Sequence, residues 1–155
     1  MTDVLLRRQP PENAFIAVNN LLASAHSVRD ISPLDVLRIC DEYRTDIRGP
    51  LRSRLERLYS DYLLFCLADR HLSDVEIRDL AHLQAVLRVD DCSALRIHDH
   101  AARQVFGRTV DAVLADGLID TEERAFLNTL QQDLALSGTG ANRILAARAR
   151  QRSTL

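Results

Sequence analysis

The stretch LADRHLSDVEIRDLAHLQAVLRV (residues 67–89) returns 47 residues later as LADGLIDTEERAFLNTLQQDLAL (residues 114–136). One shift without gaps aligns the two Leu-Ala-Asp turns. The same shift also aligns Glu76 with Glu123, Leu80 with Leu127, Leu83-Gln84 with Leu130-Gln131, and Leu87 with Leu134. An ungapped match of this length argues against chance. Residues from about 55 to 150 are therefore predicted to form two copies of a helix–turn–helix unit, packed about a pseudo-twofold axis.

Capping signals support helices on both sides of each turn. Ser73 and Glu76 have the spacing of a capping box, in which the two side chains satisfy backbone N–H groups at a helix start. Asp120 and Glu123 repeat that spacing, and Gly117 is suited to close the preceding helix in the left-handed conformation. Ser32-Pro33 is a further helix start. The whole chain reads as about seven helices without a strand, which is an all-α fold.

Apolar spacing extends this prediction to the core and to the domain organisation. One helix carries a buried stripe of Leu51, Leu55, Leu58, Tyr62 and Phe65, and the next carries Ile77, Leu80, Leu83 and Leu87. We predict a single domain over residues 1–155. Within it, residues 1–50 supply N-terminal helices that pack on the repeat pair. Residues 55–102 form the first repeat and residues 103–150 the second.

The composition limits the function classes. All 20 Lys+Arg residues are arginines, and 22 Asp+Glu residues give a net charge of −2. This near balance provides no overall field that would favour nucleic acid or an anionic membrane. No stretch reaches the roughly 18–20 apolar residues of a membrane span. Cys40, Cys66 and Cys92 lack zinc or disulfide spacing, and Cys40 and Cys66 are predicted to be buried thiols. We expect a cytoplasmic protein with no nucleic-acid partner.

The acidic turns allow two interpretations. If Asp116 and Gly117 are placed at the fifth and sixth positions of an EF-hand loop, Glu123 falls at the twelfth. The first and third positions would then be Ala112 and Leu114, which cannot ligate calcium, so a true EF-hand is excluded. One remaining interpretation is helix capping. The other is a weak divalent-cation site that draws on both turns, with Asp69, Glu76, Asp116, Asp120 and Glu123 as its ligands; no other cofactor is predicted.

The remaining polar motifs indicate no catalytic site. His98 and His100 are two residues apart on a helix, so they point about 200° away from each other and cannot share one metal. A solvated helix start is the preferred interpretation of this segment. No serine or cysteine has a local activating pattern, and the chain contains no glycine-rich phosphate loop. The sequence therefore predicts a protein that is not an enzyme.

The two quoted stretches resemble the TerB-like superfamily, which includes tellurite-resistance TerB and the N-terminal domain of a DnaJ-type membrane co-chaperone. The characteristic element there is an Ala-Asp-Gly turn, an acidic capping residue and Leu-x-x-Leu. Residues 96–136 are also similar to the C-terminal part of the large scaffold subunit of the chloroplast inner-envelope import translocon. The resemblance implies a seven-helix fold with internal pseudosymmetry. It further implies a role in stress or metalloid resistance, or in scaffolding and chaperone docking, with an acidic surface that associates with divalent metal in some members.

Arg70 departs from that pattern, because it stands where glycine is expected and its guanidinium would oppose a bound cation. The leading hypothesis is accordingly a non-enzymatic TerB-like module that acts through a helical surface on an unidentified protein partner. The alternative is a divalent-metal-responsive protein of the tellurite-resistance type that uses the acidic turns.

Overall fold

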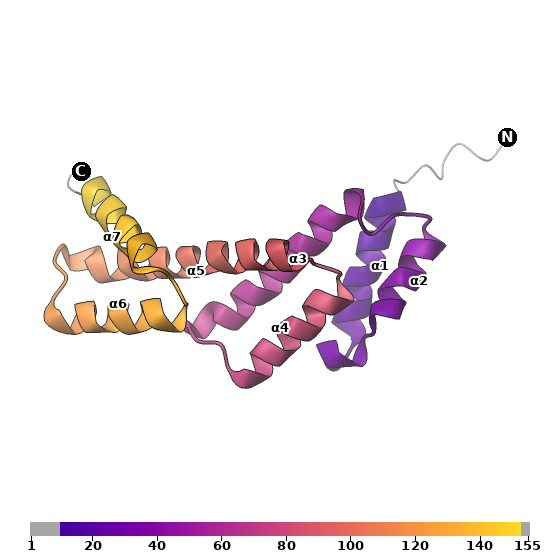
Figure 1. Cartoon of the computed structure of the whole chain (residues 1–155), viewed down its shortest axis with the longest axis horizontal. Coiled ribbons are helices and arrows are strands. Elements are labelled where there is room, and N and C mark those ends of the chain that lie inside the picture. The colour runs from indigo at the N-terminus through magenta and orange to yellow at the C-terminus, as the bar shows by residue number, and fades with distance from the viewer. Residues whose placement is uncertain (1–9, 153–155) are drawn as a thin grey trace. The chain divides into compact units, whose positions relative to one another are not determined.

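The computed structural model describes residues 10–152, which form seven α-helices and no β-strand (Figure 1). The all-α prediction is confirmed. The α-helices and the short 3₁₀ helices between them are, in chain order, α1 (Pro10–Ser24), η1 (Val28–Asp30), α2 (Pro33–Glu42), α3 (Pro50–Cys66), η2 (Leu67–Asp69), α4 (Asp74–Val86), α5 (Asp91–Val113), η3 (Leu114–Asp116), α6 (Thr121–Asp133) and α7 (Gly138–Arg152). Among these residues, no helix combines the length and the apolar character that a membrane crossing needs.

The chain divides into two compact units. Unit 1 contains residues 10–62 and 74–94 of the described chain, and unit 2 contains residues 63–73 and 95–152. In unit 1, η1 packs against α4: Arg29 pairs with Asp79 at 2.6 Å, and Nε2 of His82 lies 2.8 Å from the carbonyl oxygen of Ile31. The buried side chains of unit 1 include Val18, Val36, Leu51, Leu55, Tyr59, Leu83, Val86 and Leu87.

In unit 2, α6 runs back alongside α5, and α7 lies across α5 (Figure 1). The guanidinium of Arg152 donates to the carbonyl oxygens of Asp111, in the last turn of α5, and of Leu114, the first residue of η3. A cation at this end of a helix also complements the helix dipole. The buried side chains of unit 2 include Leu63, Ile97, Phe106, Val110, Leu127, Leu130, Leu134 and Ala141.

The 47-residue shift relates the backbones as well as the sequences. It carries Leu67–Asp69 onto Leu114–Asp116, Asp74–Val86 onto Thr121–Asp133, and the start of α5 onto the start of α7. It also carries the two left-handed residues of the first copy, Arg70 and Arg88, onto Gly117 and Ala135, which have positive φ as well. Matching hydrogen bonds close the turns, such as Val89 N–H to Gln84 and Leu136 N–H to Gln131, both at 3.0 Å. Each copy is therefore a helix, a tight 3₁₀ turn, a second helix followed by a left-handed residue, and the start of a third helix. The first copy consists of α3, η2, α4 and the start of α5, and the second consists of the later part of α5 with η3, α6 and the start of α7, so that α5 belongs to both copies.

Two residues predicted to be buried are exposed. Phe65, in the last turn of α3, exposes 76% of its surface, and Ile77, near the start of α4, exposes 50%. Both continue the apolar spacing of their helices, but among the residues that the structure describes, none of the same unit buries either side chain. The prediction of burial was wrong at these two positions. Cys40 and Cys66 are buried, as predicted, and Cys92 is exposed.

Candidate functional site

The second acidic turn forms a helix cap. Asp120 Oδ1 accepts the N–H of Glu123 at 2.8 Å, and Glu123 Oε2 accepts the N–H of Asp120 at 2.9 Å, so both carboxylates satisfy the backbone at the start of α6. In the first turn, Asp69 Oδ1 accepts the N–H of His71 at 3.1 Å. Glu76 lies in the first turn of α4. Three of the five predicted metal ligands thus make hydrogen bonds to the backbone of their own turn.

These acids are not seen to gather into a cation site. Among the residues whose side chains the structure describes, no three histidine, cysteine, aspartate or glutamate side chains come together in a group that could hold a metal ion. The backbone of Asp116 ends η3, and its side chain lies outside the described part of the chain. The metal-ligand set proposed from the sequence therefore stays a prediction.

Arg70 occupies the left-handed position that glycine occupies in the second turn. Its φ is 68°, against 92° for Gly117, and the left-handed conformation costs a residue with a Cβ roughly 1–2 kcal/mol. The guanidinium of Arg70 lies 5.8 Å from the ring centroid of Phe126 on α6, within the range of a cation–π interaction. The arginine that stands in the first turn where the second turn has glycine thus contacts an aromatic ring within unit 2.

His98 differs from the solvated histidine that the sequence analysis preferred. The side chain is half-buried, and this burial lowers the pKa of the imidazole below its ordinary value because it disfavours the charged form. His100 is exposed on the same helix. The repeat explains why His98 is half-buried. A shift of 47 residues in either direction carries residue 98 onto a leucine, Leu51 in α3 or Leu145 in α7. His98 therefore stands at a position that is apolar elsewhere in the chain.

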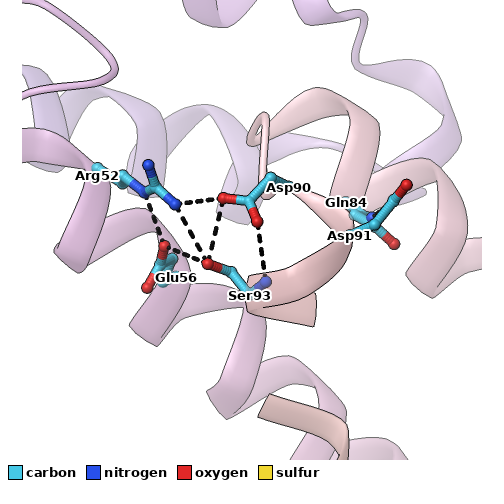
Figure 2. Close-up of polar contacts among 6 residues, drawn as sticks. All are labelled: Arg52, Glu56, Gln84, Asp90, Asp91 and Ser93. Carbon is cyan, nitrogen blue, oxygen red and sulfur yellow. Dashed lines mark hydrogen bonds and ion pairs between the residues drawn. The ribbon is translucent and has the colours of Figure 1, made fainter. Parts of the chain in front are cut away.

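One polar cluster in unit 1 has no counterpart among the predictions made from the sequence. It consists of Arg52 and Glu56 on α3 with Asp90 and Ser93 at the start of α5 (Figure 2), and we call it the first capping cluster. Asp90 Oδ1 accepts the N–H of Ser93 at 2.9 Å, the usual bond of an N-cap residue. Arg52 donates to Glu56 at 2.9 Å, and its Nη2 also contacts Asp90 and Ser93.

The charges in this cluster are mutually stabilised. The backbone N–H of Ser93 and then its hydroxyl lower the pKa of Asp90, with Arg52 adding to the effect. The bond to Glu56 and the charge of Asp90 raise the pKa of Arg52. The Ser93 hydroxyl lies 3.0 Å from Glu56 Oε1 and 3.2 Å from Asp90 Oδ2, but Ser93 is buried. A nucleophile must reach its substrate, so this enclosed hydroxyl is suited to positioning a helix and not to attack.

The nearby pair Gln84 and Asp91 completes the polar contacts at this helix start. Gln84 Nε2 donates to Asp91 Oδ1 at 2.9 Å (Figure 2). These two residues line a shallow, open groove of about 520 Å³ together with Pro33, Ala81, Ala85, Arg88 and Val89. A second hollow in unit 1 is mostly apolar and holds about 260 Å³, below the usual size of small-molecule pockets. Neither hollow brings together an acid, a base and a nucleophile.

Comparison with known proteins adds no relative. No protein-family model, curated protein or solved structure matches this chain. The TerB-like resemblance therefore stays a prediction.

Proposed function

We propose that this chain is a non-enzymatic, cytoplasmic TerB-like module that binds a protein partner through its helical surface, in stress response or as a scaffold or chaperone-docking domain. The observation that carries the proposal is the exposure of large apolar side chains at the Leu-Ala-Asp turns. Phe65 lies two residues before the first turn and Leu118 two residues after the second, and they expose 76% and 80% of their surfaces. Contiguous exposed apolar surface on a globular protein marks interaction sites, and we take these two side chains to belong to such a surface.

The polar chemistry supports the same proposal. The buried polar side-chain atoms in the described part of the chain all have hydrogen-bond partners. The polar cluster in Figure 2 caps a helix, and Asp120 and Glu123 cap another. Catalytic sites, in contrast, often hold reactive groups that are strained or incompletely satisfied. The hydrogen bonds of the described buried polar groups thus have a role in folding, which supports an activity carried by the helical surface.

A capture experiment tests the proposal. The wild type and the variants Phe65→Ser and Leu118→Ser are immobilised separately and exposed to lysate of the native host. We expect the wild type to retain a defined protein that at least one variant loses, because a serine removes the apolar contact. Leu34→Ser is the matched control, since Leu34 is also exposed, at 63%, but belongs to unit 1, whereas both turns belong to unit 2. Identical captured proteins on all four surfaces would contradict the proposal.

The same proposal predicts little response to divalent cations. We expect millimolar Ca²⁺, Mg²⁺ or Zn²⁺ to shift the melting temperature by less than about 1 °C relative to EDTA, because the bonds of Asp120 and Glu123 are made to the backbone. A ligand at 100 times its Kd would add about 2.7 kcal/mol, a shift of several degrees for a domain of this size. A shift of that size that is abolished in the double variant Asp116→Asn, Glu123→Gln would instead support the metal-responsive alternative.

A further inference from the structure

The two copies share their backbone but differ in the chemistry of their helix caps. The start of α5 is capped by Asp90, whose carboxylate accepts the N–H of Ser93 at 2.9 Å. The 47-residue shift places Ser137 and Gly140 at the same positions at the start of α7, and Ser137 Oγ accepts the N–H of Gly140 at 3.1 Å. The N-cap residue is thus a charged aspartate in the first copy and a neutral serine in the second. The residue three positions later is serine in the first copy and glycine in the second.

The helix that contacts each cap also differs between the copies, in the order of an acidic and a basic residue. In the first copy α3 presents Arg52 and Glu56, which pair at 2.9 Å. The equivalent residues of α5 are Asp99 and Arg103, which pair at 2.7 Å with the charges reversed. The guanidinium of Arg103 passes so close to α7 that a Cβ at Gly140 would stand 3.4 Å from Nη1. We call Asp99, Arg103, Ser137 and Gly140 the second capping cluster.

A second close contact between α5 and α7 also involves residues that differ from their equivalents in the first copy. Arg148 of α7 covers Gly107 of α5, with its Nη2 only 3.3 Å from where a Cβ would stand, and its Nε lies 3.5 Å from Asp111. The shift places Ser60 and Ala101 at the positions of Gly107 and Arg148. A large side chain over glycine in one copy thus corresponds to two small side chains in the other.

Part of the apolar burial is the same in the two copies. Leu80 and Leu83 of α4 correspond to the buried Leu127 and Leu130 of α6, and the buried residue one turn into α5 and α7 is alanine in both, at 94 and 141, whereas the buried Val86 corresponds to the exposed Asp133. Hydrophobic packing is non-directional, so similar apolar faces can be exchanged between repeats. Such exchange between identical chains is a known route to swapped dimers.

We propose that the two capping clusters act as pairing determinants, which direct the start of α5 onto α3 and the start of α7 onto α5 and oppose the exchanged pairing, above all with a second copy of this chain. If α7 docked on α3, Glu56 would meet Gly140, which has no hydroxyl, and Arg52 would meet Ser137, which has no carboxylate. Charge-assisted hydrogen bonds would be lost at both positions. Opposing wrong partners by such mismatches is how related interfaces achieve specificity.

The reverse exchange is opposed by repulsion. If the start of α5 docked on residues 99–103 of another copy, the carboxylate of Asp90 would meet that of Asp99, because Arg52 occupies the position of Asp99 in the native contact. Like charges in direct contact are destabilising.

The experiment converts the first cluster into a copy of the second by four substitutions: Arg52→Asp, Glu56→Arg, Asp90→Ser and Ser93→Gly. Full-length protein is refolded from urea over a range of concentrations, and its dimer fraction is measured by size-exclusion chromatography with light scattering. We expect the dimer fraction to rise about tenfold over the wild type, the change produced by a discrimination of about 1.4 kcal/mol. The single variant Glu56→Arg, which breaks the cluster without copying the second, is the matched control and should lose stability without this rise.

A rescue variant separates pairing specificity from general destabilisation. Adding Asp99→Arg, Arg103→Glu, Ser137→Asp and Gly140→Ser to the four substitutions exchanges the two clusters completely, so they differ again and the dimer fraction should return toward that of the wild type. The proposal is overturned if the fourfold variant refolds with the dimer fraction of the wild type. It is equally overturned if the control or the eightfold variant shows the same rise as the fourfold variant.

Discussion

Leu83→Ala is expected to lower the free energy of unfolding by about 3 kcal/mol, within the range of 2–5 kcal/mol that removal of a buried leucine side chain costs. Leu83 exposes only 1% of its surface, in the second half of α4 in unit 1. The alanine leaves a cavity that helices can close only in part, because their backbone hydrogen bonds hold their shape. The loss therefore contains both the transfer free energy of the side chain and the cost of the cavity.

Leu130→Ala should cost a similar amount, because Leu130 is the equivalent residue of α6 and exposes 3% of its surface. Urea denaturation followed by circular dichroism at 222 nm measures both variants, and the absence of tryptophan makes this a better probe than fluorescence. Leu95→Ala is the control, since Leu95 exposes 72% of its surface and should change the free energy by less than about 0.5 kcal/mol. A cost below about 1 kcal/mol for one leucine and about 3 kcal/mol for the other would contradict equivalent packing in the two copies.

The helices and their caps could be predicted because their causes are local in the sequence. Ser32-Pro33 starts α2, and Asp120 with Glu123 forms the predicted capping box of α6. Gly117 adopts the left-handed conformation predicted for the end of the preceding helix. A cap depends on residues within one turn of each other, so spacing alone identifies it. The repeat could be recognised for a related reason. Two copies with the same helix and turn lengths place their capping residues and leucines at the same intervals along the sequence.

The exposure of Phe65 and the first capping cluster could not be predicted in this way, because both depend on distant residues. Apolar spacing shows which face of α3 is apolar, but only packing shows how far along the helix that face is covered. The cluster joins Arg52 and Glu56 to residues 34 or more positions later in the chain. The signal that could have found it is the comparison of the two copies, in which the Arg52–Glu56 pair becomes Asp99–Arg103.

His98→Leu is expected to raise the free energy of unfolding by about 1 kcal/mol at pH 7, because leucine gains more from the removal of apolar surface from water than imidazole does. The equivalent residues Leu51 and Leu145 show that the repeat accommodates leucine at this position, and Leu51 is fully buried. The difference in the free energy of unfolding between His98→Leu and the wild type should increase at acidic pH. Burial lowers the pKa of His98 in the folded protein below its ordinary value near 6.5, so on acidification the unfolded state takes up its proton first.

The sign of the pH dependence follows from that difference in proton uptake. Where the unfolded state binds more protons, stability falls as the pH falls, so His98 weakens the wild type from about pH 6.5 downward until the folded protein also becomes protonated. Urea denaturation at pH 7.5, 6.5, 5.5 and 5.0 should therefore show a smaller loss of stability for His98→Leu than for the wild type. His98→Gln separates the two causes, because glutamine is polar but does not titrate: it should reduce the pH dependence without the gain at pH 7. If both variants kept the full pH dependence of the wild type, the prediction would be wrong. The loss of stability at acidic pH would then come from titratable groups that both variants retain.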